Sequence, residues 1–322
     1  MPAPVVAACL LALGAAALQE IVIGVVEQPE RAQQLATMAE VALSGTAGTV
    51  QRSALEPGEA LAPGGAVCAL ADEGAAPVAL AGGDTRALRL AAGAAARAGL
   101  PLLLLDPAPA NATWEALELF PHPDVLAQAC AALLEAKGWR RAVLLHEGGA
   151  HGAARLSAGD EPPALLARLL PPPGDFALLR NLLLVLKKSG ATNFIVWCSA
   201  ECTVRVLDAA QRVGLLSDRH SYIALALDLH SQPLADYSYG GANITGLRLF
   251  DTNSSAVLAT MSKWEELYRT TVTPAAARSV AAAPPTALLL AYVGAALATE
   301  AWRRLDLPSV YSANCAAGVG AF

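Results

Sequence analysis

The chain contains 322 residues, of which 55% are hydrophobic and 16% are charged, a composition that excludes intrinsic disorder. Its 22 Lys and Arg residues against 28 Asp and Glu give a net charge of −6, so nothing favours binding to nucleic acid or to an acidic membrane surface. At about 150 residues per domain, this length predicts two domains or lobes.

The amino-terminal residues predict a secreted protein. Residues 1–18 carry no charged side chain and place small alanines at positions 15–17, which is typical of a signal peptide and its cleavage site. A membrane anchor is the alternative, but this run is short for a span of about 20 residues. The apolar stretch from Thr286 to Thr299 is also too short to span and is expected to be a buried helix.

Sequons and cysteines agree with the secretory pathway. Asn111, Asn243 and Asn253 each begin an N-x-[S/T] sequence and are predicted glycosylation sites. Beyond the expected signal peptide, the cysteines are Cys68, Cys130, Cys198, Cys202 and Cys315. Because this number is odd, at least one thiol is free or pairs outside the chain.

Strand and helix patterns alternate along most of the chain. Buried strands are expected over residues 19–28, 75–81, 101–106, 141–146, 193–199 and 222–227. Helices are expected over residues 29–43, 84–99, 123–137, 175–189 and 200–213. Residues 44–68, rich in Gly, Pro and Ala, are expected to be loose. The alternation predicts an α/β protein with parallel sheets covered by helices.

Two breaks divide this pattern into lobes. The chain is expected to leave one lobe near residues 119–123 and to return near 237–243. Lobe 1 would then comprise residues 19–121 and 251–322, and lobe 2 residues 122–250. The ends of parallel strands in such a protein line a cleft. The residues predicted to line it are Glu27, Gly82, Thr85, Asp106, His146, Ser199 and Asp228.

Several segments resemble one family of receptors. In residues 193–229, a strand runs into Cys198-Ser199, and a helix, a Val-Gly turn and a strand ending in Leu-Asp-Leu follow. Next come the segment 239–249 (YGGANITGLRL) and Lys263-Trp264, while Gly138-Trp139 precedes a strand ending in His-Glu. These features resemble the amino-terminal domains of kainate-type ionotropic glutamate receptors. The resemblance extends from residue 19 to 315 and is strongest over 193–264, with Ala291 a departure where the family has Asp.

The resemblance implies a bilobed fold of the type I periplasmic-binding-protein kind, with two parallel-sheet lobes. It also implies a disulfide between Cys68 and Cys315 and a buried thiol at Cys198. Cys202 lies one helical turn after Cys198 and is expected to pack beside it. The implied role is dimerisation and tetramer assembly with other glutamate receptor subunits, within a ligand-gated cation channel of the synapse. Glutamate would bind only through a domain that this chain lacks.

The chain stops at Phe322, before the last strands of lobe 2 in this family. It therefore reads as a fragment or as a truncated product. The full-length protein would lie on the extracellular face of the plasma membrane, and a product that ended at Phe322 would be secreted.

Signatures of catalysis are missing from the sequence. His146 and His151 lie five residues apart, whereas the zinc motif HExxH needs histidines four apart on one helix face. P-loop, G-x-S-x-G, G-x-G-x-x-G and C-x-x-C sequences do not occur. We therefore expect a protein that is not an enzyme and that uses no cofactor or metal.

Two questions stay open at this point. Asp84, beside Thr85 at a helix start, would repel an α-carboxylate, which weighs against an amino acid in the cleft. The alternative function is nevertheless an amino-acid-binding ectodomain of another receptor class, or a secreted binding protein of the same fold. The small, apolar helix over residues 87–98 either packs within its own lobe or meets a partner subunit.

Overall fold

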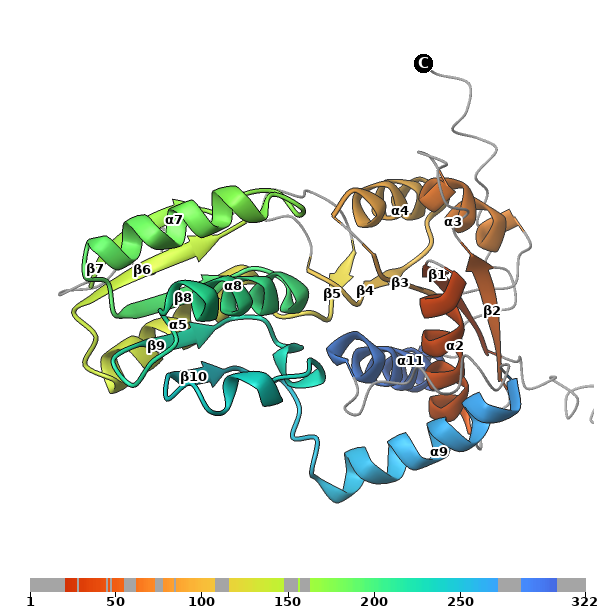
Figure 1. The fold of residues 1–322 in the computed structure, drawn as a ribbon. Coiled ribbons are helices and arrows are strands. Elements are labelled where there is room, and N and C mark those ends of the chain that lie inside the picture. Colours follow the sequence, from red (N-terminus) through yellow and green to blue (C-terminus); the bar gives the residue numbers. More distant parts are fainter. Residues whose placement is uncertain are drawn as a thin grey trace, which may run out of the picture.

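A computed structural model describes residues 21–27, 29–44, 46, 48–54, 62–72, 78–83, 85–107, 116–147, 156, 163–271 and 285–305. These residues form two α/β lobes that lie side by side (Figure 1). One sheet has the strand order β2-β1-β3-β4-β5 and the other β10-β9-β8-β6-β7. Neighbouring strands pair in parallel throughout both sheets. The predicted bilobed α/β fold with two parallel sheets is confirmed.

Lobe 1 contains the first sheet. Its strands are β1 (Ile21–Glu27), β2 (Gly48–Ala54), β3 (Val78–Ala81), β4 (Leu102–Leu104) and β5 (Leu117–Glu118). Its helices are α2 (Pro29–Leu43), α3 (Ala62–Asp72), α4 (Thr85–Ala98), α9 (Ser255–Thr271) and α11 (Thr286–Leu305). Because neighbouring side chains of a strand point to opposite faces, Val25 packs with α2, α9 and α11 whereas Val26 packs with α3 and α4.

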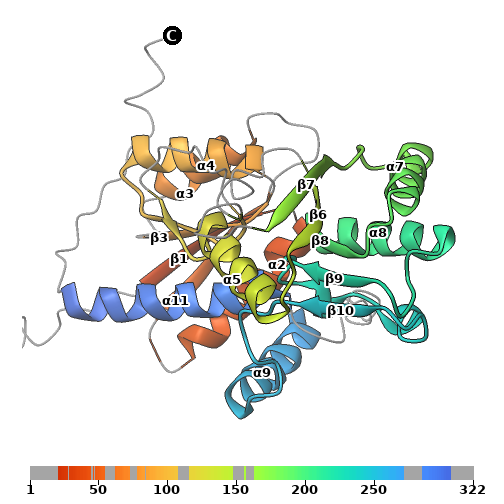
Figure 2. The same cartoon turned by 90° about the vertical axis from the view of Figure 1, so that its left-hand side faces the viewer.

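Lobe 2 contains the second sheet. Its strands are β6 (Arg141–His146), β7 (Ala164–Leu169), β8 (Asn193–Trp197), β9 (Ser221–Ala224) and β10 (Asn243–Gly246). Its helices are α5 (Pro123–Ala136), α7 (Phe176–Lys188) and α8 (Ala200–Val213), with the short 3-10 turns η1 (Leu229–Ser231) and η2 (Ala235–Tyr237). Val143 and Leu145 pack under α7 and α8, while Ala142 and Leu144 pack against α5 on the other face. Figure 2 shows α5 on one side of this sheet and α7 and α8 on the other.

Most expected elements form close to their predicted bounds, but residues 44–68 are a correction. This stretch holds β2 and the start of α3 rather than a loose segment. β2 lies at a sheet edge, where Arg52 is exposed, so it lacks the apolar run of a central strand. α3 begins with Ala-Pro-Gly-Gly, which resembles a turn although proline is tolerated in the first turn of a helix.

The chain passes from the first sheet to the second between β5 and α5 and returns between β10 and α9. The lobe limits at 121/122 and 250/251 stay predictions, and the expected signal peptide lies outside the described residues. None of the helices within the described ranges combines the length and the apolar character that crossing a membrane requires.

Trp264 packs helix α9 against helix α2 of lobe 1. Its side chain is 1% exposed, and its indole Nε1 donates a hydrogen bond of 3.1 Å to the carbonyl oxygen of Gln34 on α2. The ring stacks on Tyr268 with centroids 4.8 Å apart. The tryptophan of the Lys-Trp pair noted in the sequence therefore has a structural role in packing α9 against α2.

We predict that Trp264→Ala lowers the free energy of unfolding by about 3–5 kcal/mol, because it removes a fully buried aromatic side chain. Trp264→Phe should lower it less, since it keeps an aromatic ring against Tyr268 and loses only the hydrogen bond and part of the buried volume. Denaturant unfolding measures both, with the exposed Lys263→Ala as the control. Equal stability of Trp264→Ala and Lys263→Ala would contradict this role.

Candidate functional site

Three of the predicted cleft residues meet at the carboxyl edge of the first sheet. Glu27 ends β1, Gly82 follows β3 and Asp106 lies two residues after β4. These strands are neighbours in a parallel sheet, so their carboxyl ends meet at one edge. A Cβ added to Gly82 would clash with the Glu27 carboxylate and lie 3.0 Å from Oδ2 of Asp106. Only glycine leaves room for the two acidic side chains here.

Arg31, which was not predicted from the sequence, forms ion pairs with both carboxylates at this edge. It lies near the start of α2, 3.3 Å from Oε2 of Glu27 and 2.8 Å from Oδ2 of Asp106. The same Asp106 oxygen accepts a 2.8 Å hydrogen bond from the backbone N–H of Gly83. The i, i+4 spacing of Glu27 and Arg31 was the signal available in the sequence.

Glu27, Arg31 and Asp106 form an ion cluster in which burial and the neighbouring carboxylates have opposite effects on the pKa of Arg31. Burial alone would lower the pKa of Arg31, but the carboxylates of Asp106, Glu27 and Asp228 raise it above its ordinary value. The guanidinium therefore stays charged. Its donors already serve two carboxylates, and the three acidic groups outnumber it, so the edge does not offer a free cation to an amino acid's carboxylate.

Asp228 connects the two lobes. It follows β9 in lobe 2, yet its Oδ1 accepts a hydrogen bond from the backbone N–H of Thr286, the first residue of α11 in lobe 1. The first N–H groups of a helix lack partners within the helix, and a carboxylate there also complements the helix dipole. Asp228, which was predicted to line the cleft, therefore caps a helix of the other lobe.

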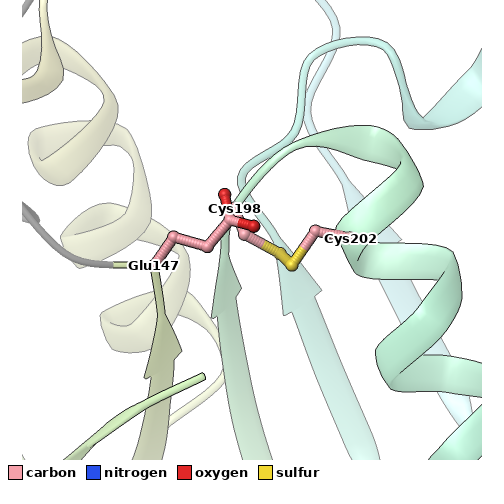
Figure 3. A group of neighbouring side chains, drawn as sticks. All are labelled: Glu147, Cys198 and Cys202. Atoms are coloured by element: carbon pink, nitrogen blue, oxygen red, sulfur yellow. A yellow bond between two sulfur atoms is a disulfide. The ribbon is translucent and has the colours of Figure 1, made fainter. Parts of the chain in front are cut away.

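Lobe 2 presents a second group of strand-end residues. His146 ends β6, and Ser199 caps α8 by accepting a 3.2 Å hydrogen bond from the backbone N–H of Cys202. Cys198, just after β8, forms a disulfide with Cys202 across a Cα–Cα distance of 5.8 Å (Figure 3). The expected thiol at Cys198 is therefore wrong: the tight turn from strand to helix brings the two side chains within bonding distance.

Glu147 lies beside this disulfide. Its carboxylate and the two sulfurs are within 4.8 Å of one another, and among the described residues these three side chains are the ones close enough together to bind one metal ion. In the disulfide, however, neither sulfur is a thiolate. In the sequence, Glu147 belonged to the His-Glu strand end of the family resemblance and to a failed HExxH motif. The pairing of Cys198 with Cys202 escaped it because a spacing of four residues also suits two cysteines packed on one helix face.

The structure describes some of the remaining predicted sites and not others. Cys68 is disulfide-bonded, while Cys315 and Asn111 lie outside the described residues, so the Cys68–Cys315 pairing stays a prediction. Asn243 and Asn253 are both exposed, as glycosylation requires. Thr85 begins α4.

Cys130 of α5 is a free, buried thiol, and burial raises its pKa to about 12. Such a thiol stays protonated at neutral pH and is inert as a nucleophile. It is the unpaired cysteine among the described residues.

The small-residue helix α4 packs within its own lobe. Ala91, Ala94 and Ala95 are buried in a cluster with Val67 and Leu70 of α3. Alanines let the two helices approach closely while arginines at positions 86, 89 and 97 face solvent. Of the two alternatives for this helix, the buried faces therefore support packing inside lobe 1.

We predict that Arg31→Met lowers the free energy of unfolding by about 2–3 kcal/mol, because the buried Glu27 and the partly buried Asp106 lose a counter-ion that is itself partly exposed. Thermal unfolding at neutral pH measures the loss. In the double variant Glu27→Gln/Arg31→Met the repulsion is relieved, so much of the stability should return. Additive losses in the double variant would show that the two side chains do not interact.

We predict that Asp228→Ala lowers the free energy of unfolding by about 1–2 kcal/mol through loss of the α11 cap. Asp228→Asn keeps an oxygen acceptor and should be affected less. Hydrogen exchange in the first turn of α11 gives the local readout and should accelerate in Asp228→Ala. Unchanged exchange there would rule out the cap between lobes.

Comparison with known proteins finds a family of receptors that this chain matches. Residues 78–305, more than half of the chain, match the model of the receptor family ligand binding region. A segment of 153 residues is 26% identical to mouse "Glutamate receptor ionotropic, kainate 1", covering 46% of this chain and 18% of the mouse protein. The human protein of the same name is also 26% identical over 153 residues, with 16% of its length covered. The match thus spans under a fifth of these relatives.

Proposed function

This chain belongs to the receptor family ligand binding region, and from that premise we propose that it is the extracellular amino-terminal domain of a kainate-like ionotropic glutamate receptor subunit. Its task is dimerisation with other receptor subunits and their assembly into a channel. The protein is not an enzyme in this account, and the family and the relatives are named as receptors.

Apolar side chains at one edge of lobe 2 are the observation that carries the assembly role. β7 is an edge strand of its sheet, and Leu169 on it is 61% exposed. The next helix, α7, leaves Leu178 55% and Val185 62% exposed, while other leucines on this helix are buried. We call β7 and α7 with these three side chains the β7–α7 edge. Unpaired edge strands and exposed apolar groups are features that association covers.

The strand-end charges favour assembly over capture of an amino acid. An amino-acid site of this fold needs a free positive group or unoccupied amides for the α-carboxylate. At the edge of lobe 1, Arg31 is paired with two carboxylates and Gly83 N–H is bonded to Asp106. Glutamate would then act through another domain of a longer subunit, and this domain would lie in the extracellular space.

Sedimentation velocity of the purified, secreted chain tests the proposal. We predict ligand-independent self-association that Leu169→Asp or Val185→Asp weakens by at least about tenfold, because a buried charge at an interface is unpaired. Leu258→Asp on α9, where the leucine is 56% exposed, is the matched control and should associate normally. A monomer that also fails to join kainate receptor subunits would contradict the proposal.

Calorimetry with amino acids addresses the alternative of a ligand-binding ectodomain. We predict no saturable heat with glutamate or other α-amino acids. A micromolar heat signal that Asp106→Ala or Ser199→Ala abolishes, in variants that remain folded, would instead assign the strand-end residues to a ligand.

A further inference from the structure

We propose that Cys198, Cys202 and Glu147 form a binding site for a thiophilic divalent cation such as Zn²⁺, which becomes available when the Cys198–Cys202 disulfide is reduced. This site lies at the carboxyl edge of the second sheet, where Glu147 directly follows His146, the residue of β6 that pairs with Leu169 of β7. It stands or fails independently of the assembly role.

The donor set and its placement fit zinc. Two cysteine sulfurs and a carboxylate oxygen lie within 4.8 Å of one another (Figure 3). Zinc takes such ligands at about 2.0–2.3 Å in a tetrahedron, and sites with three protein ligands keep the fourth position for water. On a tetrahedral zinc ion, two thiolates lie about 3.8 Å apart. Once the disulfide opens, side-chain rotation at Cys198 and Cys202 can provide this separation across a Cα–Cα distance of 5.8 Å.

Rigid elements position all three ligands. Glu147 follows β6, Cys198 follows the adjacent strand β8, and Cys202 lies in the first turn of α8. Ser199 fixes that turn through its hydrogen bond with the backbone N–H of Cys202. Sites built on strand ends and a capped helix hold their geometry better than sites on long loops.

The local charges suit a dication. Two thiolates and Glu147 contribute three negative charges, and Arg205, 3.6 Å from Oε1 of Glu147, contributes one positive charge. The net charge of about −2 on the reduced site matches Zn²⁺. Arg205 is placed where an outer partner of a metal ligand would be, next to the carboxylate.

The disulfide is accessible and closes only a short loop. Cys198 is partly exposed, so a small reductant can reach its sulfur. The two cysteines are four residues apart, and a loop this short gains little from loop-closure entropy. The N-terminus of α8 stabilises negative charge on the sulfur of Cys202 when it leaves.

The reaction balances with a thiol as the reductant. One thiolate attacks the sulfur of Cys198 and releases Cys202, which leaves a mixed disulfide on Cys198. A second thiol then attacks the external sulfur of this mixed disulfide and releases Cys198, so the products are two protein thiols and one external disulfide. The reductant's two thiols are oxidised, and the protein disulfide gains two electrons and two protons. Zinc then replaces those two protons on the sulfurs.

Cobalt binding tests the site. The full chain is reduced with a phosphine, freed of reductant and metal by anaerobic gel filtration, and titrated with Co²⁺. We predict a thiolate-to-cobalt charge-transfer band that the oxidised chain lacks and that Zn²⁺ abolishes. Glu147→Gln should weaken cobalt binding by about tenfold or more, whereas Glu201→Gln, an exposed carboxylate at the start of the same helix, should not.

Two further variants locate the ligands. The double variant Cys198→Ser/Cys202→Ser should give no band after reduction, and Cys130→Ser should keep it. The proposal is overturned if the double variant keeps the band, if the oxidised chain shows it, or if Glu147→Gln binds like Glu201→Gln. Alkylation and intact mass show whether the disulfide opens; a folded chain in which it resists reduction would also overturn the proposal.

Discussion

The arginine at the start of α2 is the interaction on which the strand-end geometry depends. Arg31 neutralises a glutamate that is 1% exposed and an aspartate from a different strand, 75 residues further along the chain. A buried carboxylate is costly unless it is paired, so this ion pair lets three strands end in close contact. The same pairing occupies the cation that would otherwise be available to a small anionic ligand.

A residue of the second lobe also takes part in this arrangement of charges. Asp228 caps α11 from the other sheet and adds its negative charge to the field around Arg31. α11 in turn packs on α2, the helix that carries the arginine. One connected set of charges and helices therefore relates the two lobes, which is a structural use of the strand-end residues. Part of the apolar surface that stays exposed lies on the β7–α7 edge.

The sequence predicted central elements better than edges. Buried strands such as β1 and β8 show apolar runs, and Glu27, Gly82 and Asp106 were found because strand ends of a parallel sheet converge. β2 was missed because this edge strand shows neither an apolar run nor a clear alternation. β7 was missed because its short apolar run, ALLARL, does not distinguish a strand from a piece of buried helix. The Asp228 cap on α11 joins residues 58 apart in different lobes, which no local pattern reveals.

Assembly with receptor subunits is the central claim, and co-secretion tests it most directly. The chain and the amino-terminal region of the human kainate 1 receptor are expressed together, and mass photometry counts the secreted species with and without glutamate. The account predicts dimers that contain this chain, in equal amounts under both conditions, and a loss of those dimers with Val185→Asp. Secreted monomers of this chain alone, with a melting temperature that glutamate raises, would contradict it.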